Sequence, residues 1–500
     1  MATNQVTKKM VNSGPRTRKS SSKSKERTAV PKQRDAVVKK DNTAAKVRMY
    51  RQGLGDCFFV TLPRTNGRPY YLMIDCGVIL GTPDAASKME LVVNNIIATT
   101  GGHLDLLVIT HEHWDHLSGF VQAKDLFTKL KIDKVWLAWT EDPNDELANK
   151  LRAERQALRI ALTSACARMR LGGVGDSTID GLMEFFGAAG QGTTGEALKI
   201  VKGFCQDVRY CRPTDAPVAL EGVNARTYVL GPPHDEGMIK RFNPSRSHPE
   251  TYGAAAVDLD AQALAIADTD LQAPFDPIVQ IPVEVAQQMR FFQVHYWGED
   301  PDATKGANHT DHTEKTESAS QRETAVDQSW RRIDSEWLAA STNLALQLDS
   351  ATNNTSLALA IELGGGKVLL FAADAQVGNW LSWQDLSWTV GGKTITGPDL
   401  LKRTHLYKTG HHGSHNATLR EKGLEMMSAL EIALIPVDHD MALKKGWGKM
   451  PLEELEQRLN AITKDRVLRI DKEVPPALAG RVEQDESKAL YYEVTVQENT

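Results

Sequence analysis

The chain has 500 residues, a length that corresponds to about three domain-sized units and allows a large core. Its composition, with 41% hydrophobic and 25% charged residues, excludes collagen-like and wholly disordered chains. The longest apolar runs, such as Leu104 to Thr110, are much shorter than the ~20 residues needed to span a bilayer, so we expect no membrane anchor.

Charge and cysteine usage indicate the compartment. The net charge of −5 is unevenly spread, since residues 1–48 carry 14 Lys and Arg against three acidic residues. The five cysteines are odd in number and lack a Cys-x-x-Cys pair, which favours a reducing compartment over a disulfide scaffold. The first residues also lack the apolar segment of a secretory signal, so we predict a cytoplasmic protein.

Residues 1–46 are rich in Ser, Thr, Lys and Arg and contain no aromatic residue. Such a segment buries too little apolar surface to offset the entropy lost on ordering, so we expect a disordered tail. Its positive charge would attract nucleic acid or another anionic surface through counterion release. The alternative is a solubilising extension without a partner.

Short apolar runs and one helical pattern predict the first elements of the fold. A glycine-bearing turn from Gln52 to Asp56 joins the first two runs and predicts a hairpin. The third run ends at Asp75-Cys76-Gly77, and the fourth has the apolar, β-branched character of a buried strand. We expect strands over 47–50, 57–62, 70–74 and 104–110, and a helix over 86–99.

The fourth predicted strand leads into His-Glu-His-Trp-Asp-His, which contains His111, His113, Asp115 and His116. So many imidazoles and carboxylates after a buried strand are costly unless something pairs them, and divalent metals such as zinc prefer this ligand mixture. His111 and His113 can point the same way from an extended loop, whereas Asp115 and His116 turn toward a neighbouring position. The spacing therefore suits two adjacent metal ions, and the alternative is a histidine-rich surface loop.

These four residues match the H-x-H-x-D-H signature of the metallo-β-lactamase superfamily, which the sequence resembles here. The strand before Asp75-Cys76-Gly77 is similar to the strand-Asp-Gly element of the same superfamily. The resemblance implies an α/β fold, specifically an αββα sandwich with the metals at one edge of its two sheets. It further implies that Asp75 orients the ligand loop.

Two later strand ends resemble the remaining metal motifs of the superfamily. A hairpin predicted over 353–374 ends at Asp374, in the place of the metal-bridging aspartate. A strand predicted over 404–409 ends at Gly-His-His-Gly-Ser, and this step resembles the ComEC-type competence branch. The Asn-Asn-x-Ser-Leu start of the hairpin and the Gly-Leu-Gly-Asp turn are similar to that branch as well. The resemblance implies His412 as a ligand, with His411 packing beside it or orienting substrate.

The superfamily usually has one more histidine ligand, and its position here is less clear. A predicted strand over 227–233 nominates His234, although this residue could instead lie exposed in an acidic turn. His415 and His439 each follow a candidate strand, and either could protonate a leaving group or have only a structural role. His309 and His312 lie in a Thr/Glu/Asp-rich stretch that we interpret as a mobile loop.

The gaps between the motifs predict helical insertions within a hydrolase domain that covers residues 47–500. One, at about 120–220, is expected to be mainly helical, with a leucine stripe that includes Leu151 and Leu162. The other, at about 235–345, contains an acidic loop and a helix docked on the sandwich. After His415 we expect helix, strand over 432–437, helix from Pro451, and strand over 467–470.

Two close divalent ions can lower the pKa of a shared water and clamp both the attacking and leaving oxygens of a displacement. We therefore expect a hydrolase with two Zn²⁺ ions, or Mn²⁺ as an alternative, in which hydroxide attacks a phosphodiester of DNA or RNA. The catalytic candidates are Asp115, His411 and His415. The metal-ligand candidates are His111, His113, Asp115, His116, His234, Asp374 and His412.

Two other functions stay open from the sequence. The first is another hydrolase of the same fold that cleaves a thioester, a lactone or a small phosphodiester. The second is a non-catalytic nucleic-acid-binding module with structural metals. Structural zinc sites are usually closed cages of four ligands, and the larger ligand set of this chain argues against the second function.

Overall fold

The computed structural model describes residues 44–171, 187–188, 192–245, 250–252, 283–286, 288–293 and 345–497. Nearly all of the predicted basic tail lies outside the described residues, as do His309, His312 and most of the predicted insertion at 235–345. The first described strand, β1, starts at Ala44, three residues before the predicted start of the domain.

Two mixed β-sheets form the centre of the described structure. One sheet has the order β10 (Val208–Cys211), β7 (Val135–Ala138), β5 (Leu106–Val108), β3 (Tyr70–Ile74), β2 (Phe58–Leu62), β1 (Ala44–Tyr50), β21 (Tyr491–Gln497) and β20 (Val482–Gln484). The other has the order β11 (Val218–Ala219), β12 (Ala225–Gly231), β13 (Ala358–Leu363), β14 (Val368–Phe371), β17 (Thr404–Lys408), β18 (Ile432–Ile435) and β19 (Val467–Arg469).

Each sheet combines an antiparallel part with a parallel part. In the first sheet, β3, β5, β7 and β10 pair in parallel, and the remaining neighbours are antiparallel. In the second sheet, β14, β17, β18 and β19 pair in parallel. Loops that leave the carboxyl ends of parallel strands emerge at one edge of a sheet, which is where open α/β sheets bind ligands.

Apolar side chains from the two sheets meet in a shared core. Along β14, Leu369 and Phe371 belong to this core, whereas Val368 and Leu370 pack into a second core on the opposite face of the sheet. This division follows from the period of two along a strand. Because both faces are covered, the strand is a continuous apolar run rather than an alternating one.

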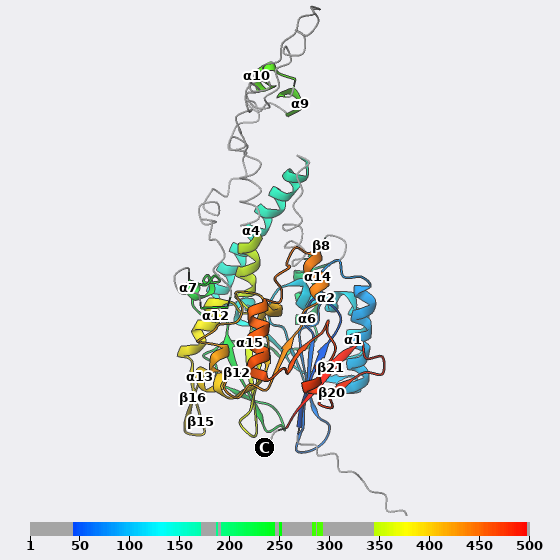
Figure 1. The fold of residues 1–500 in the computed structure, drawn as a ribbon, viewed down its shortest axis with the longest axis vertical. Helices are drawn as coiled ribbons and strands as arrows, with labels where there is room; N and C mark the ends of the chain where they lie inside the picture. Colours follow the sequence, from blue (N-terminus) through cyan, green and yellow to red (C-terminus); the bar gives the residue numbers. More distant parts are fainter. Residues whose placement is uncertain are drawn as a thin grey trace, which may run out of the picture. The chain divides into compact units, whose positions relative to one another are not determined.

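Helices cover the outer face of each sheet, as Figure 1 shows. The first sheet is covered by α1 (Ala85–Thr100), α2 (Trp114–Gln122), α3 (Lys124–Phe127) and α6 (Thr194–Lys202). The second is covered by α12 (Val377–Ser382), α13 (Gly397–Lys402) and α15 (Glu453–Thr463). The layers thus follow the order helix, sheet, sheet, helix, and the predicted α/β class is confirmed.

Smaller elements complete the described chain. The remaining α-helices are α4 (Glu146–Leu171), α7 (Glu236–Ile239), α9 (Val283–Ala286), α10 (Arg290–Phe292) and α14 (His439–Lys444). The remaining strands are β4 (His103–Leu104), β6 (Lys131–Ile132), β8 (Gly187–Ala188), β9 (Gly192–Thr193), β15 (Ser387–Val390) and β16 (Lys393–Thr396). Residues 345–353 are also helical.

The described part of region 120–220 is mainly helical, as predicted, but it also adds strands to the first sheet. It contains β7 and β10, which pair in parallel and extend the first sheet. Each of these strands has only four residues, too few for a periodic pattern to distinguish strand from helix. The leucine stripe of α4 was predicted correctly, since Leu151 and Leu162 are buried.

The hairpin predicted over 353–374 is present, but its first strand begins later. The antiparallel pair is β13 with β14, and β13 starts at Ala358. Asn353 is instead the last residue of the helical stretch 345–353. The sequence pattern correctly placed the turn and the second strand, and therefore also the position of Asp374 just beyond that strand.

Candidate metal centre

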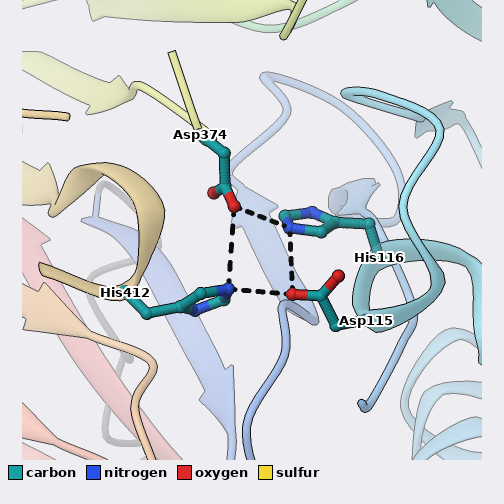
Figure 2. A group of neighbouring side chains, drawn as sticks. All are labelled: Asp115, His116, Asp374 and His412. Carbon is teal, nitrogen blue, oxygen red and sulfur yellow. Dashed lines mark hydrogen bonds and ion pairs between the residues drawn. The ribbon is translucent and has the colours of Figure 1, made fainter. Parts of the chain in front are cut away.

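Side chains that are far apart in the sequence converge where β5, β14 and β17 end. Asp115 and His116 lie in the first turn of α2, whereas Asp374 follows β14 and His412 follows β17. Figure 2 shows the four side chains pointing toward one another, and one donor atom from each lies within 4.8 Å of the others. His412 Nε2 is 3.0 Å from Asp115 Oδ2, and His116 Nε2 is 3.2 Å from Asp374 Oδ2.

His111 and His113 form a second pair of donors beside this group. His111 Nε2 lies 3.1 Å from His113 Nδ1, and the rings of His111 and His116 have centroids 4.2 Å apart. His411 joins the same site, since its Nε2 is 3.9 Å from Asp374 Oδ2. The structure thus brings together six of the seven residues predicted as metal ligands, and it adds His411.

Burial controls the protonation of the donors. It lowers the pKa of His111 well below the usual value, that of His113 to about 3 and that of His411 to about 4. Burial would also lower the pKa of His116 and His412, but the carboxylates of Asp374 and Asp115 outweigh this effect and raise both. The first three imidazoles are therefore neutral at pH 7, which is the form that binds metals.

The chemistry of the donors fits a cation. Several buried polar atoms at the site have no hydrogen-bond partner within the described part of the chain, among them Asp115 Oδ1, Asp349 Oδ1 and His411 Nδ1. Uncompensated buried polar atoms are costly, and imidazole and carboxylate donors are those that divalent metals of the zinc type prefer. The buried His/Asp groups could therefore hold a metal ion.

Two hydrogen bonds orient the imidazoles toward the cluster. His116 Nδ1 lies 2.8 Å from Asp75 Oδ2, which also accepts a hydrogen bond from the Thr110 hydroxyl. His412 Nδ1 is 2.9 Å from the carbonyl oxygen of Pro436. In both rings the outer nitrogen is held by an oxygen, which leaves Nε2 facing the site. The contact of Asp75 is the one that its predicted orienting role requires.

Lys408 is a buried cation that the sequence analysis missed. Its ammonium is 2.7 Å from Asp56 Oδ2 and 3.1 Å from Asp374 Oδ1, and it donates to the carbonyl of Ala373. Burial would raise the pKa of Asp374, but Lys408 and His116 outweigh it and hold that pKa well below its usual range. A lysine as the last residue of an apolar strand, four residues before His412, was the available signal.

Glycines allow the backbone to approach the ligand loop closely. A Cβ on Gly77 would lie 2.4 Å from the carbonyl oxygen of Asp115, and one on Gly55 would lie 2.6 Å from the same oxygen. The amide of Asp56 donates to that oxygen at 3.0 Å, and the amide of Cys76 donates to the His116 carbonyl at 2.9 Å. The predicted Gly-Leu-Gly-Asp turn therefore supports the loop that carries Asp115 and His116.

The structure does not bring His234 into the cluster. Its Nε2 is 2.8 Å from Asp145, its ring lies 4.3 Å from that of Trp139, and 42% of its side chain is exposed. Trp139 also donates from its indole to the carbonyl of Pro232, which fixes the chain just before His234. The predicted ligand role of His234 therefore lacks structural support, because the strand before it leads to a different set of partners.

The other two histidine candidates also have partners outside the cluster. His415 lies 3.5 Å from the hydroxyl of its neighbour Ser414, and burial lowers its pKa, with Lys449 adding to this effect. His439 Nδ1 is 2.8 Å from the carbonyl oxygen of Met450. Neither residue belongs to a possible metal-holding group among the described residues, and the choice between a proton donor and a structural role stays a prediction for both.

A further buried carboxylate, Asp349, escaped the sequence analysis. It lies in the helical stretch 345–353, its Oδ1 is 3.9 Å from His113 Nε2, and it accepts a hydrogen bond from Asn353. Burial, together with Asp115 and Asp374, raises the pKa of Asp349 well above its usual range. The available signal was an Asp and an Asn four residues apart, a spacing that places both side chains on one face of a helix.

Comparison with known proteins adds no assignment. No protein-family model matches the chain, and no curated protein is a significant match. None of the described helices is both long enough and apolar enough to cross a membrane.

Gly77→Ala should disrupt the ligand loop, because the new methyl group would overlap the backbone of Asp115. Over-packing of this kind typically costs about 1–3 kcal/mol or more. We expect a lower midpoint in urea unfolding and a lower metal content after dialysis. Gly195→Ala is the matched control, since a Cβ there has its nearest neighbour at 4.0 Å. Equal midpoints for the two variants would contradict this account of Gly77.

Metal uptake at pH 7 should release protons. The pKa of His116 is raised well above its usual value, so this imidazole is charged at pH 7 when no metal is bound, and the neighbouring carboxylates also raise the pKa of His412, whereas a metal binds only the neutral ring. Calorimetric titration with Zn²⁺ in buffers of different ionisation enthalpy gives the number of protons released. The number should fall as pH rises through these raised pKa values. Uptake without proton release at pH 7 would rule out the predicted charge states.

Proposed function

We propose that the protein is a metal-dependent hydrolase of the metallo-β-lactamase fold, and that it cleaves phosphodiester bonds of DNA or RNA. The observation that carries this proposal is the convergence of His111, His113, Asp115 and His116 with Asp374 and His412 in one buried cluster. The four-layer arrangement of helices and sheets supports it, because the cluster lies at the ends of strands from both sheets.

The donor set divides into two neighbouring positions that share Asp374. His111, His113 and His411 would hold one divalent ion, and Asp115, His116 and His412 would hold the other. We propose zinc for both, with manganese as the alternative. When bound, the two ions supply a hydroxide near neutral pH and neutralise the charge of a phosphodiester.

Residues of the chain itself would prepare this site. Lys408 holds Asp374 by its Oδ1, so that Oδ2 faces His116 and His411. Asp75 fixes the ring of His116, and the Pro436 carbonyl fixes that of His412. Ligands held rigidly before substrate arrives need no reorganisation during the reaction.

The size of the donor set favours catalysis over a structural metal. A structural zinc is usually enclosed by four protein ligands, whereas six or seven donors shared between two positions leave coordination places for water and substrate. Hydrolysis of a thioester, a lactone or a small phosphodiester by the same site is the competing outcome, and the following experiment separates it from nuclease activity.

Purified protein supplied with Zn²⁺ or Mn²⁺ should cut labelled single- or double-stranded DNA or RNA. Asp374→Asn keeps the shape of the side chain but removes the shared anion, so we expect activity to fall by at least about 100-fold. His234→Ala is the control, and it should retain activity because His234 lies outside the cluster. Turnover of small esters alone, with intact nucleic acid, would refute the nuclease assignment.

The basic tail provides a separate test of the nucleic-acid partner. Removal of residues 1–43, which leaves β1 intact, should weaken binding to DNA or RNA and reduce the dependence of affinity on salt concentration. A full-length variant with the tail lysines and arginines changed to glutamine controls for length. Unchanged affinity and salt dependence in both proteins would show that the tail is not an electrostatic tether.

A further inference from the structure

Asp349 lies directly behind one of the proposed metal ligands. It is only 6% exposed, and its Oδ1 is 3.9 Å from His113 Nε2. It comes from the helical stretch 345–353, which is far in sequence from the loop of His113. The carboxylate is thus a separate element of the site rather than a neighbour in the chain.

The two ring nitrogens of His113 face different partners. Nδ1 lies 3.1 Å from His111 Nε2, on the side where a shared ion would be bound, whereas Nε2 faces Asp349. An imidazole that coordinates through one nitrogen presents the N–H of the other, and this group commonly donates to a carboxylate. A carboxylate at Nε2 would keep the proton on that nitrogen and leave the lone pair of Nδ1 for the metal.

Asn353 holds Asp349 in this position. Its Nδ2 donates to Asp349 Oδ2 at 3.1 Å and lies 3.4 Å from His411 Nε2. The two side chains are one helical turn apart, so they are neighbours on one face. The bond to Oδ2 leaves Oδ1 without a hydrogen-bond partner among the described residues, on the side of His113.

The arrangement has a counterpart on the other side of the cluster. His116 Nδ1 lies 2.8 Å from Asp75, so that Nε2 of the ring faces Asp374. In His113 the roles of the two nitrogens are exchanged, but a buried carboxylate again lies behind the ring. Each of the two proposed metal positions would then have one histidine backed by an aspartate.

We propose that Asp349 is a positioning residue that orients His113 and fixes its tautomer for the metal held by His111 and His113. This inference rests on the metal pair of the proposed function. His113 Nε2 and Asp349 Oδ1, which lie 3.9 Å apart, would approach to hydrogen-bonding distance when Nδ1 coordinates a metal. The role belongs to Asp349 itself, which no superfamily motif in the sequence includes.

Metal binding, rather than catalysis, tests the proposal. Zn²⁺ affinity is measured by chelator competition, and the ligand geometry is followed by the visible absorption of the Co²⁺-loaded protein. Asp349→Asn should weaken the binding of one of the two metals by about 10- to 100-fold and leave the affinity for the other unchanged. It should also alter the Co²⁺ spectrum. Asn353→Ala, which leaves the carboxylate in place but removes the donor that orients it, should weaken the same metal less.

A variant that removes a buried charge outside the metal cluster distinguishes an effect on ligand orientation from a general loss of stability. Glu493 is also buried and pairs with Arg48, so Glu493→Gln should lower thermal stability without changing either metal affinity. In Asp349→Asn the midpoint of thermal unfolding without metal should equal that of the wild type. Only the increase of this midpoint on adding Zn²⁺ should be smaller. In a His113→Ala background the Asp349 substitution should have no further effect on metal affinity.

Three results would overturn the proposal. They are unchanged affinities and spectrum in Asp349→Asn, equal weakening of both metals, or full additivity with His113→Ala. A wild-type protein that binds two metals but cuts no nucleic acid would refute the proposed function and leave the role of Asp349 to be judged by these titrations. A wild-type protein that binds no metal would refute both.

Discussion

The structure depends on the compensation of several carboxylates that are buried at the edge where the two sheets meet. Asp56, Asp75, Asp115 and Asp374 are all nearly inaccessible to water, and removing each from water costs several kcal/mol unless it is paired. Lys408 supplies one shared positive charge, and the carboxylates raise the pKa of His116 and of His412, which favours protons on these two rings as further positive charge. A divalent cation would displace those protons and compensate the same carboxylates more fully. The buried carboxylates therefore destabilise the folded protein when they are not compensated, and the same carboxylates create its affinity for cations. Metal binding should stabilise the folded state by mass action.

The backbone around these groups is held in unusual conformations. Asp75, Ala373, His411 and His412 all have φ between 43° and 56°, in the left-handed region that side chains other than glycine rarely adopt. Such residues cost on the order of 1–3 kcal/mol each and persist only where the surroundings enforce them. Here the surroundings are the close contact of Gly77 with the Asp115 backbone and the hydrogen bond from the His411 amide to the Ala373 carbonyl. Four strained positions occur within one cluster. The positions required of the side chains therefore outweigh the intrinsic conformational preference of the backbone there.

Sequence reasoning succeeded where a strand and a functional residue are adjacent in the chain. Asp374 just after β14 and the histidine pair just after β17 could be placed because a buried strand is a strong local pattern and its end is marked by a polar residue. It failed where a residue's role depends on contacts with residues far away in the sequence. His234 follows β12 as expected, but its partners Trp139 and Asp145 come from a part of the chain whose short strands gave no periodic signal. Lys408 and Asp349 are recognisable only once β17 and the stretch 345–353 are known to reach the same cluster.

The absence of His234 from the cluster does not leave the proposed metal pair short of a ligand. His411 and His412 are consecutive, and in an extended strand consecutive side chains would point to opposite faces. Their left-handed conformations change this, so that both rings enter the cluster with centroids 5.9 Å apart and planes at 60°. His412 Nε2 then approaches Asp115, whereas His411 Nε2 approaches Asp374 and Asn353. One strained turn would thus supply a histidine to each proposed metal position, which gives the glycine-flanked His-His step a physical reason and removes the need for a ligand from the 227–234 segment.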